Sequence, residues 1–72
     1  MQDAKLFRRA RRAAGLTYRE VAQAARMDTS SIANYEALRG RPSQKAAERW
    51  RHALVALLSR RAAEVNALLT EL

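Results

Sequence analysis

The side chains of this chain suit hydrogen bonding and charge interactions better than covalent chemistry. The 72 residues include no cysteine and one histidine, His52, so the chain offers neither a disulfide, a thiolate metal site nor a histidine cluster. Serines, threonines and glutamates occur without a visible pairing of nucleophile and base, and we therefore predict no enzyme activity and no cofactor or metal. The most distinctive feature is a polar cluster between residues 29 and 34, made of small hydroxyl and amide side chains.

Two capping signals indicate the helices that present this cluster. Thr17 and Glu20 fit a capping box, in which the hydroxyl accepts from the N–H of residue 20 and the carboxylate reaches back to the N–H of residue 17. Asp28 follows eleven residues later, where it can cap a second helix. Hydrophobic staples are expected across both caps, between Leu16 and Val21 and between Met27 and Ile32. Two short helices with a tight corner form a helix-turn-helix, whose second helix enters the DNA major groove.

The apolar spacing predicts an all-α chain without strands. We expect helices over residues 4–14, 18–25, 29–37 and 44–72. Asp3 and Ser43 are expected to cap the first and last of them, and Gly15 to end the first in a left-handed conformation. The residues expected to face the core are Leu6, Phe7, Ala10, Ala14, Val21, Ala22, Ala25, Ile32, Tyr35, Ala46, Ala47, Trp50, Leu54 and Leu57.

The last helical stretch carries a second apolar stripe beyond the one that closes the core. It consists of Leu58, Ala62, Val65, Leu69 and Leu72, at alternating spacings of four and three residues. One interpretation is an unbroken helix of about 29 residues and about 43 Å, whose second stripe is a dimerisation surface. The other is a break near Ser59 and Arg60, with a fifth helix folded back onto the core. We favour the first, with a DNA-binding domain over residues 1–57 and a helical extension over residues 58–72.

The charge balance favours a polyanionic partner. Fourteen lysines and arginines against seven aspartates and glutamates give a net charge of +7 and a pI of about 11.3. Residues 1–42 hold nine basic and four acidic residues, whereas residues 43–72 hold five and three, so the first part is the more basic. Basic proteins also bind RNA or acidic membranes, but no apolar run approaches the roughly 20 residues that span a bilayer.

These features together resemble the Cro/repressor-type helix-turn-helix family of phage and bacterial regulators, also called the xenobiotic-response-element (XRE) family. The match runs without gaps from Phe7 to Pro42. It rests on the opening RRARRAAGLT of residues 8–17, the small Ala22, the apolar Met27, Ile32 with Tyr35 and Glu36, and a loop ending in Arg41 and Pro42. The resemblance implies a lambda-repressor-like bundle of four to five helices with a long C-terminal helix, in a cytoplasmic, nucleoid-associated protein of a bacterium or phage.

The resemblance also assigns base-reading residues. Thr29, Ser30 and Asn34 match the family's base-reading positions, and Ser31 and Ala33 flank the same surface. An asparagine can bond an adenine edge at two points, whereas a threonine or serine reads less specifically and a threonine methyl can contact a thymine methyl.

Further positions match residues that grip the DNA backbone or brace the fold. The phosphate-binding positions are Thr17, Tyr18, Arg19, Arg39, Arg41 and Lys45, of which Tyr18 replaces the glutamine that is usual in the family. Arg11 matches an arginine that pairs with the glutamate after the recognition helix, here Glu36, and we expect this ion pair to be structural. Arg8, Arg9 and Arg12 could face either DNA or solvent.

Two turn positions also depart from the family pattern. Arg26 stands where the turn usually has glycine, and a left-handed conformation there costs a non-glycine residue about 1 kcal/mol. Leu38 also replaces a common glycine, and we expect Gly40 to take over that bend.

We therefore predict a sequence-specific, double-stranded DNA-binding transcriptional regulator, a repressor acting as a homodimer on a near-palindromic operator with half-sites about 34 Å apart. Two alternatives stay open. One is an antitoxin-type protein that binds a partner protein through its C-terminal helix while repressing its own operon. The other is a non-specific nucleic-acid-binding protein, although RNA recognition usually needs exposed aromatics, and Phe7, Tyr35 and Trp50 are all expected to face inward. No membrane contact is expected.

Overall fold

The computed structural model describes residues 3–72, and these form four helices and no strand. The helices are α1 (Asp3–Ala13), α2 (Tyr18–Ala25), α3 (Thr29–Glu36) and α4 (Gln44–Glu71). The predicted all-α fold class is confirmed, and every predicted helix boundary agrees with the structure to within one residue.

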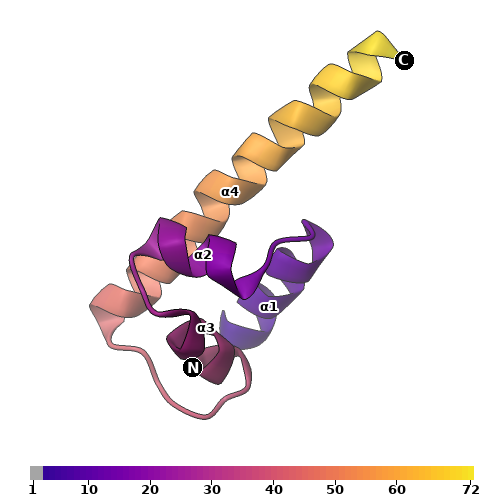
Figure 1. Ribbon diagram of the computed structural model, residues 1–72. Coiled ribbons are helices and arrows are strands. Elements are labelled where there is room, and N and C mark those ends of the chain that lie inside the picture. The colour runs from indigo at the N-terminus through magenta and orange to yellow at the C-terminus, as the bar shows by residue number, and fades with distance from the viewer. Residues whose placement is uncertain (1–2) are drawn as a thin grey trace.

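Helices α1, α2 and α3 gather around the first half of α4, and the outer half of α4 extends from this group alone (Figure 1). The molecule is correspondingly elongated, with extents of 43 × 19 × 18 Å. Helix α4 runs unbroken through Ser59 and Arg60, so the alternative of a break and a fifth helix is wrong. The reason is local, because residues 44–71 hold neither glycine nor proline and are rich in alanine, leucine, arginine and glutamate, which favour helix.

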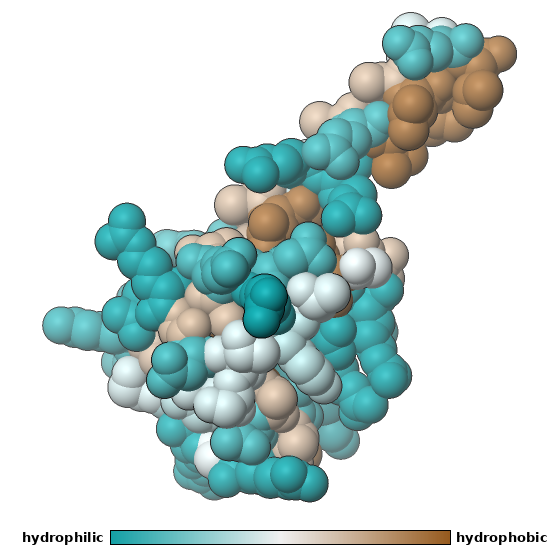
Figure 2. All heavy atoms as spheres, in the orientation of Figure 1, coloured by the Kyte–Doolittle hydropathy of each residue, from teal (hydrophilic) through white to brown (hydrophobic). Residues whose placement is uncertain are grey.

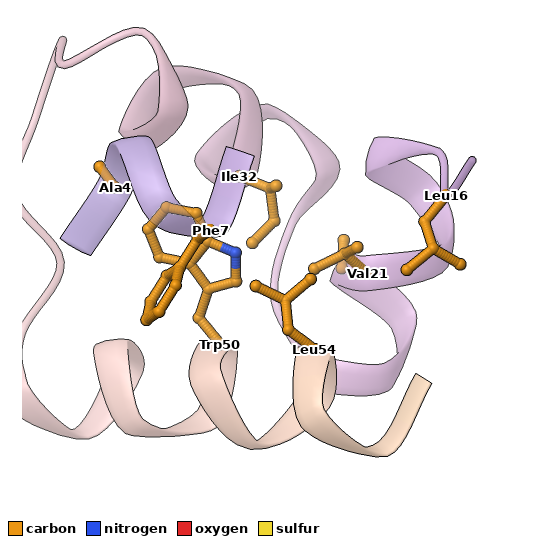
Figure 3. Packing of buried hydrophobic residues seen from close by; sticks show 8 residues of the cluster. Ala4, Phe7, Leu16, Val21, Ile32, Trp50 and Leu54 are labelled. Atoms are coloured by element: carbon orange, nitrogen blue, oxygen red, sulfur yellow. The ribbon is translucent and has the colours of Figure 1, made fainter. Parts of the chain in front are cut away.

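The core is built around Trp50 of α4, which is fully buried together with Ile32 and Val21. Figure 3 shows these side chains meeting between the helices, with the Phe7 ring against Trp50. The Phe7 and Trp50 rings lie edge to face, with centroids 4.7 Å apart, and Tyr35 approaches Trp50 to 5.9 Å. The buried cluster comprises Ala4, Phe7, Leu16, Val21, Ala22, Ile32, Trp50 and Leu54.

The predicted apolar face of α1 is wrong at Leu6, which is 50% exposed, while Ala4 is buried instead. The buried face follows Ala4 and Phe7 and continues to the half-buried Arg11, at spacings of three and four residues. Leu6 lies two residues from Ala4, which places it nearly opposite on the helix. Asp3 is already in the first turn of α1, so it does not cap the helix as predicted.

Two of the four predicted N-caps, Thr17 and Ser43, form, whereas Asp28, like Asp3, does not cap its helix. The Thr17 hydroxyl accepts from the Glu20 N–H at 3.1 Å, and the Thr17 N–H donates to the Glu20 carboxylate at 3.0 Å, which confirms the capping box. Ser43 caps α4 by accepting from the N–H of Ala46 at 3.1 Å. Asp28 occupies the N-cap position of α3, but its side chain makes no capping hydrogen bond, so this prediction is wrong.

A left-handed residue stands one or two positions after the end of each of the first three helices. Gly15 has φ of 68°, Arg26 of 57° and Leu38 of 61°. In each case the next residue donates its N–H to the carbonyl five positions earlier, at 2.9–3.0 Å, as in a Schellman motif. Gly15 behaves as predicted. The expectation that Gly40 takes over the second bend is wrong, because Leu38 itself adopts the left-handed conformation.

Candidate nucleic-acid interface

The outward face of α3 carries the polar side chains that the sequence singled out. Ser30 and Asn34 lie four residues apart on the same side of the helix, and both are exposed. Ile32, fully buried, points to the opposite side. Thr29 is also exposed and lies at the first turn, next to this face. The three predicted base-reading residues are therefore all accessible on one short helix.

The two flanking residues are less accessible. Ala33 is half-buried beside the outward face. Ser31 is half-buried too, but it lines a shallow hollow between α2, α3 and the start of α4, together with Arg26 and Arg49. The hollow brings Ser31 next to two arginines to which the sequence had assigned no DNA contact. The position of Ser31 on another side of α3 from Ser30 could have been predicted from helical spacing. The approach of Arg49 could not, because it depends on how α4 packs.

The N-terminus of α3 is open to an anion. The first turn holds no acidic residue, and the amides of Thr29 and Ser30 make no hydrogen bond within the described part of the chain. Since Asp28 makes no hydrogen bond to these amides, they stay available, and the helix dipole adds a partial positive charge at the same end. The exposed Asp28 carboxylate at the N-cap position offsets part of that positive charge.

The N-terminus of α2 is different, because its own capping box fills it. Glu20 accepts the Thr17 N–H, and this hydrogen bond lowers the pKa of Glu20 below its usual value, so the carboxylate stays charged. A fixed negative charge disfavours a phosphate at the Thr17 amide. Thr17, Tyr18 and Arg19 are nevertheless exposed, and the Arg19 guanidinium remains free to approach a phosphate from the side.

A bidentate ion pair fixes α1 to the end of α3. Arg11 donates from Nε to Glu36 at 2.7 Å and from Nη2 to the other carboxylate oxygen at 3.0 Å. Its Nη1 donates to the carbonyl of Leu16 at 2.8 Å, in the turn before α2. One guanidinium thus ties together three segments, and the hydrogen bond to Glu36 raises the pKa of Arg11 more than burial lowers it.

Tyr18 covers this ion pair from the outside. The Arg11 guanidinium carbon lies 4.3 Å from the centroid of the Tyr18 ring, in a cation–π contact. Tyr18 is 37% exposed, so part of the residue meets solvent while the ring packs on Arg11. The tyrosine therefore braces α2 against Arg11 by stacking. The only sign of this contact in the sequence is the presence of an aromatic residue at position 18.

Comparison with known protein families supplies the identification. The family model described as "Helix-turn-helix domain" matches residues 4–68, which is most of the chain. The chain belongs to the helix-turn-helix domain family. Neither the curated proteins nor the solved structures contain a match. Membership implies DNA binding at the level of the class, in which the second helix of the motif enters the DNA major groove. The two short consecutive helices α2 and α3 have the order and the tight turn that this motif requires.

The cations predicted to contact phosphate surround α3 of the helix-turn-helix. Arg39 and Arg41 are exposed in the loop after α3, and Lys45 is exposed in the first turn of α4. A second hollow, between α1 and the end of α3, is lined by Lys5, Arg8, Arg9 and Arg12 with Leu38. Exposed cations therefore follow α3 along the chain and also lie beside its end.

The predicted dimerisation stripe lies away from the helix-turn-helix, on the outer half of α4. Figure 2 shows apolar side chains gathered along one side of this projecting segment and hydrophilic ones along the other. Leu58 is half-buried near the first three helices, while Val65 and Leu69 are 47% and 64% exposed, and Ala62 and Leu72 are exposed too.

No helix among residues 3–72 is long and apolar enough to cross a membrane. No group of three or more histidine, cysteine or acidic side chains within those residues is arranged to hold a metal ion.

Proposed function

We propose that this helix-turn-helix protein is a sequence-specific DNA-binding transcriptional repressor that acts as a homodimer on a near-palindromic operator. The observation that carries the proposal is the accessible face of α3, where Ser30 and Asn34 project side by side with Thr29 at the helix start. Short hydrogen-bonding side chains on a helix that fits the major groove can read base edges directly. Asn34 is the strongest discriminator, because its amide can bond adenine at two atoms.

The flanking cations supply position and non-specific affinity. Arg39, Arg41 and Lys45 follow α3 along the chain and are exposed, so they can reach phosphates beside the groove that α3 occupies. The open amides of Thr29 and Ser30 offer a further phosphate contact at the N-terminus of α3. Thr17 and Tyr18 can offer a phosphate little beyond their hydroxyl groups. The Thr17 amide already donates to Glu20, and the Tyr18 ring stacks on Arg11.

Dimerisation is proposed to occur through the α4 extension. Residues 1–57 act as the DNA-binding domain, and residues 58–72 join two copies through Leu58, Ala62, Val65, Leu69 and Leu72. The exposed leucines and valine of this stripe are unusual on a free surface, and covering them in a second copy removes apolar area from water. A twofold dimer presents two copies of α3 to two half-sites related by the same symmetry.

The decisive experiment selects bound duplexes from a random pool and then measures affinity for the selected duplex and for random DNA. We expect the selected duplex to bind at least about 10³-fold more tightly, and its sequence to contain two inverted half-sites. Asn34→Ala should lower this ratio about tenfold or more, because one bidentate base contact is worth about 1–3 kcal/mol of discrimination. Thr70→Ala, an exposed polar residue on the α4 extension, is the matched control and should leave the ratio unchanged.

Arg41→Ala tests the phosphate contacts separately. It should weaken binding to both duplexes alike and reduce the slope of log affinity against log salt by about one. Arg60→Ala removes an exposed arginine from the outer half of α4 and should leave that slope unchanged. If the selected pool shows no enriched sequence, the protein is not sequence-specific. If Asn34→Ala keeps full sequence preference, α3 does not read the bases as proposed.

A further inference from the structure

We infer that two copies of this chain pair through the outer half of α4 in an antiparallel orientation, with the tip of each α4 seated against the end of α1 of the other copy. The inference rests on the proposed homodimer and adds its orientation and its register. It begins from a residue that the core does not use. Val55 of α4 is 52% exposed, although the neighbouring Leu54 is buried.

Val55 extends the dimerisation stripe toward the first three helices. It stands three residues before Leu58, so the complete stripe, which we call the α4 seam, is Val55, Leu58, Ala62, Val65, Leu69 and Leu72. Its spacings alternate between three and four residues throughout, which is the a and d pattern of a coiled coil. In an antiparallel pair each a residue faces a d residue of the other helix. One register satisfies all six positions, because Val55 then faces the partner's Leu72, Leu58 the partner's Leu69, and Ala62 the partner's Val65.

A hollow at the base of the seam fits the tip of a second helix. It lies between the end of α1 and α4, and it is lined by Ala13, Ala14, Leu58, Arg61, Ala62, Val65 and Asn66. In the antiparallel register the partner's Leu69 lies level with Leu58, so only the projecting tip of the partner enters this hollow. In a parallel pair the partner's α1 would lie at the same height along α4 as this hollow. The first three helices of the two copies would then clash there.

The residues beside the seam also favour the antiparallel orientation. Leu68 is 58% exposed at the edge of the seam. In the antiparallel register it lies beside the partner's Arg61, whose aliphatic stem can cover it. On the other edge Ser59 lies beside the partner's Asn66, and these two side chains can share a hydrogen bond.

Charge separates the two orientations further. Residues 1–57 hold twelve basic and five acidic residues, whereas residues 58–72 hold two of each, so the net charge of each copy lies in its DNA-binding half. A parallel pair places these two cationic halves side by side. The antiparallel register separates the two Trp50 positions by about 40 Å along α4, well beyond the Debye length of about 8–10 Å.

The same register suits a twofold DNA site. Trp50 points about 80° away from Leu58 around α4, so the first three helices pack on one flank of the seam rather than on its back. The twofold axis of an antiparallel pair keeps that flank on the same face in both copies, which puts both copies of α3 on one side of the dimer. The separation of about 40 Å is close to the turn of DNA, about 34 Å, that relates neighbouring half-sites.

Cysteine cross-linking tests the orientation directly, because the chain has no cysteine of its own. Val55→Cys and Leu72→Cys both replace exposed residues, so neither change disturbs the core. We expect an oxidised, pre-equilibrated mixture of the two variants to give mixed disulfide dimers and each variant alone to give none, since a disulfide needs Cα atoms within about 7 Å. Ala67→Cys lies on the opposite side of α4 and should cross-link with none of them.

Each other result overturns the inference, and the results separate it from the proposed homodimer. Disulfide dimers of Leu72→Cys with itself show a parallel pair, which removes the antiparallel orientation and keeps the homodimer. An absence of cross-links from a protein that sediments as a dimer means that another surface joins the copies. A chain that sediments as a monomer at every concentration, with no cross-links, removes the homodimer as well.

Discussion

Replacing Arg11 should destabilise this protein more than replacing its partner Glu36, although both changes break the same ion pair. The order follows from burial, since the side chain of Glu36 is 2% exposed and that of Arg11 is 12% exposed. Arg11→Gln leaves a charged carboxylate almost wholly inside the protein without its cation, which costs about 3–5 kcal/mol. Glu36→Gln leaves a guanidinium that keeps its hydrogen bond to Leu16 and its contact with Tyr18, and we expect a loss of about 1.5–3 kcal/mol.

These losses are large for so short a chain. A protein of this length has a free energy of unfolding of about 4–11 kcal/mol, so Arg11→Gln removes about a quarter of it or more. Urea unfolding followed by circular dichroism measures both variants and the double variant Arg11→Gln/Glu36→Gln. The double variant buries no unpaired charge, and it should lose less stability than the two single losses added together.

The ordering is the part that can fail. If Arg11→Gln is unfolded in water while Glu36→Gln still folds, the order is the expected one. If Glu36→Gln is the more destabilised variant, burial of the carboxylate does not control the energetics. If both variants lose less than about 1 kcal/mol, the pair behaves as a surface salt bridge and does not anchor α3.

Three further predictions concern the turns, the capping box and the α4 seam. Leu38→Gly and Arg26→Gly should each raise the free energy of unfolding by up to about 1 kcal/mol, because glycine adopts the left-handed conformation without strain. Gly15→Ala should lower the free energy of unfolding by about 1 kcal/mol for the same reason. A loss of stability in Leu38→Gly would contradict the assigned strain. The lowered pKa of Glu20 means that its charge stabilises the fold above the unfolded pKa of about 4.3, and that this contribution is lost as the pH falls through the folded pKa. The stability difference between the natural chain and Glu20→Gln should therefore be greatest near neutral pH and vanish in acid, and a difference independent of pH would exclude the charged capping box as its source. Leu69→Glu should convert dimers to monomers in sedimentation without changing the helix content of the first three helices, whereas Ala67→Glu, on the far side of α4, should leave the dimer intact.

Local signals in the sequence predicted the helix boundaries well. The capping box of Thr17 and Glu20 joins residues three apart, so its geometry depends on little besides the local chain. The left-handed Gly15 is local in the same sense. The pair of Arg11 and Glu36 spans 25 positions, and its prediction came from a family resemblance, because no spacing rule links residues so far apart.

Tertiary packing explains the two places where the prediction of inward and outward residues was wrong. The inward face of α1 includes Arg11, a charged residue that hydrophobic periodicity assigns to the surface, so the apolar Leu6 was placed inside in its stead. Arg11 can lie there only because Glu36 arrives from α3 to neutralise it. Val55 was overlooked for a related reason, since its neighbour Leu54 fits the core stripe and only the packed structure shows Val55 facing solvent.

The unbroken course of α4 links the two ends of the proposed function. The core residue Trp50 and the seam residue Leu58 lie about 80° apart around one helix, so the first three helices cannot cover both faces. With no flexible joint between Trp50 and Leu72, the direction in which α3 points is fixed relative to the seam. In the proposed dimer the spacing of the two reading helices is therefore set by the register of the α4 seam, and a register shift of one heptad would change that spacing by about 10 Å. Substitutions at Val55, Leu58 and Leu69 would then change which operators the protein recognises, although none of these residues contacts DNA in the proposed dimer.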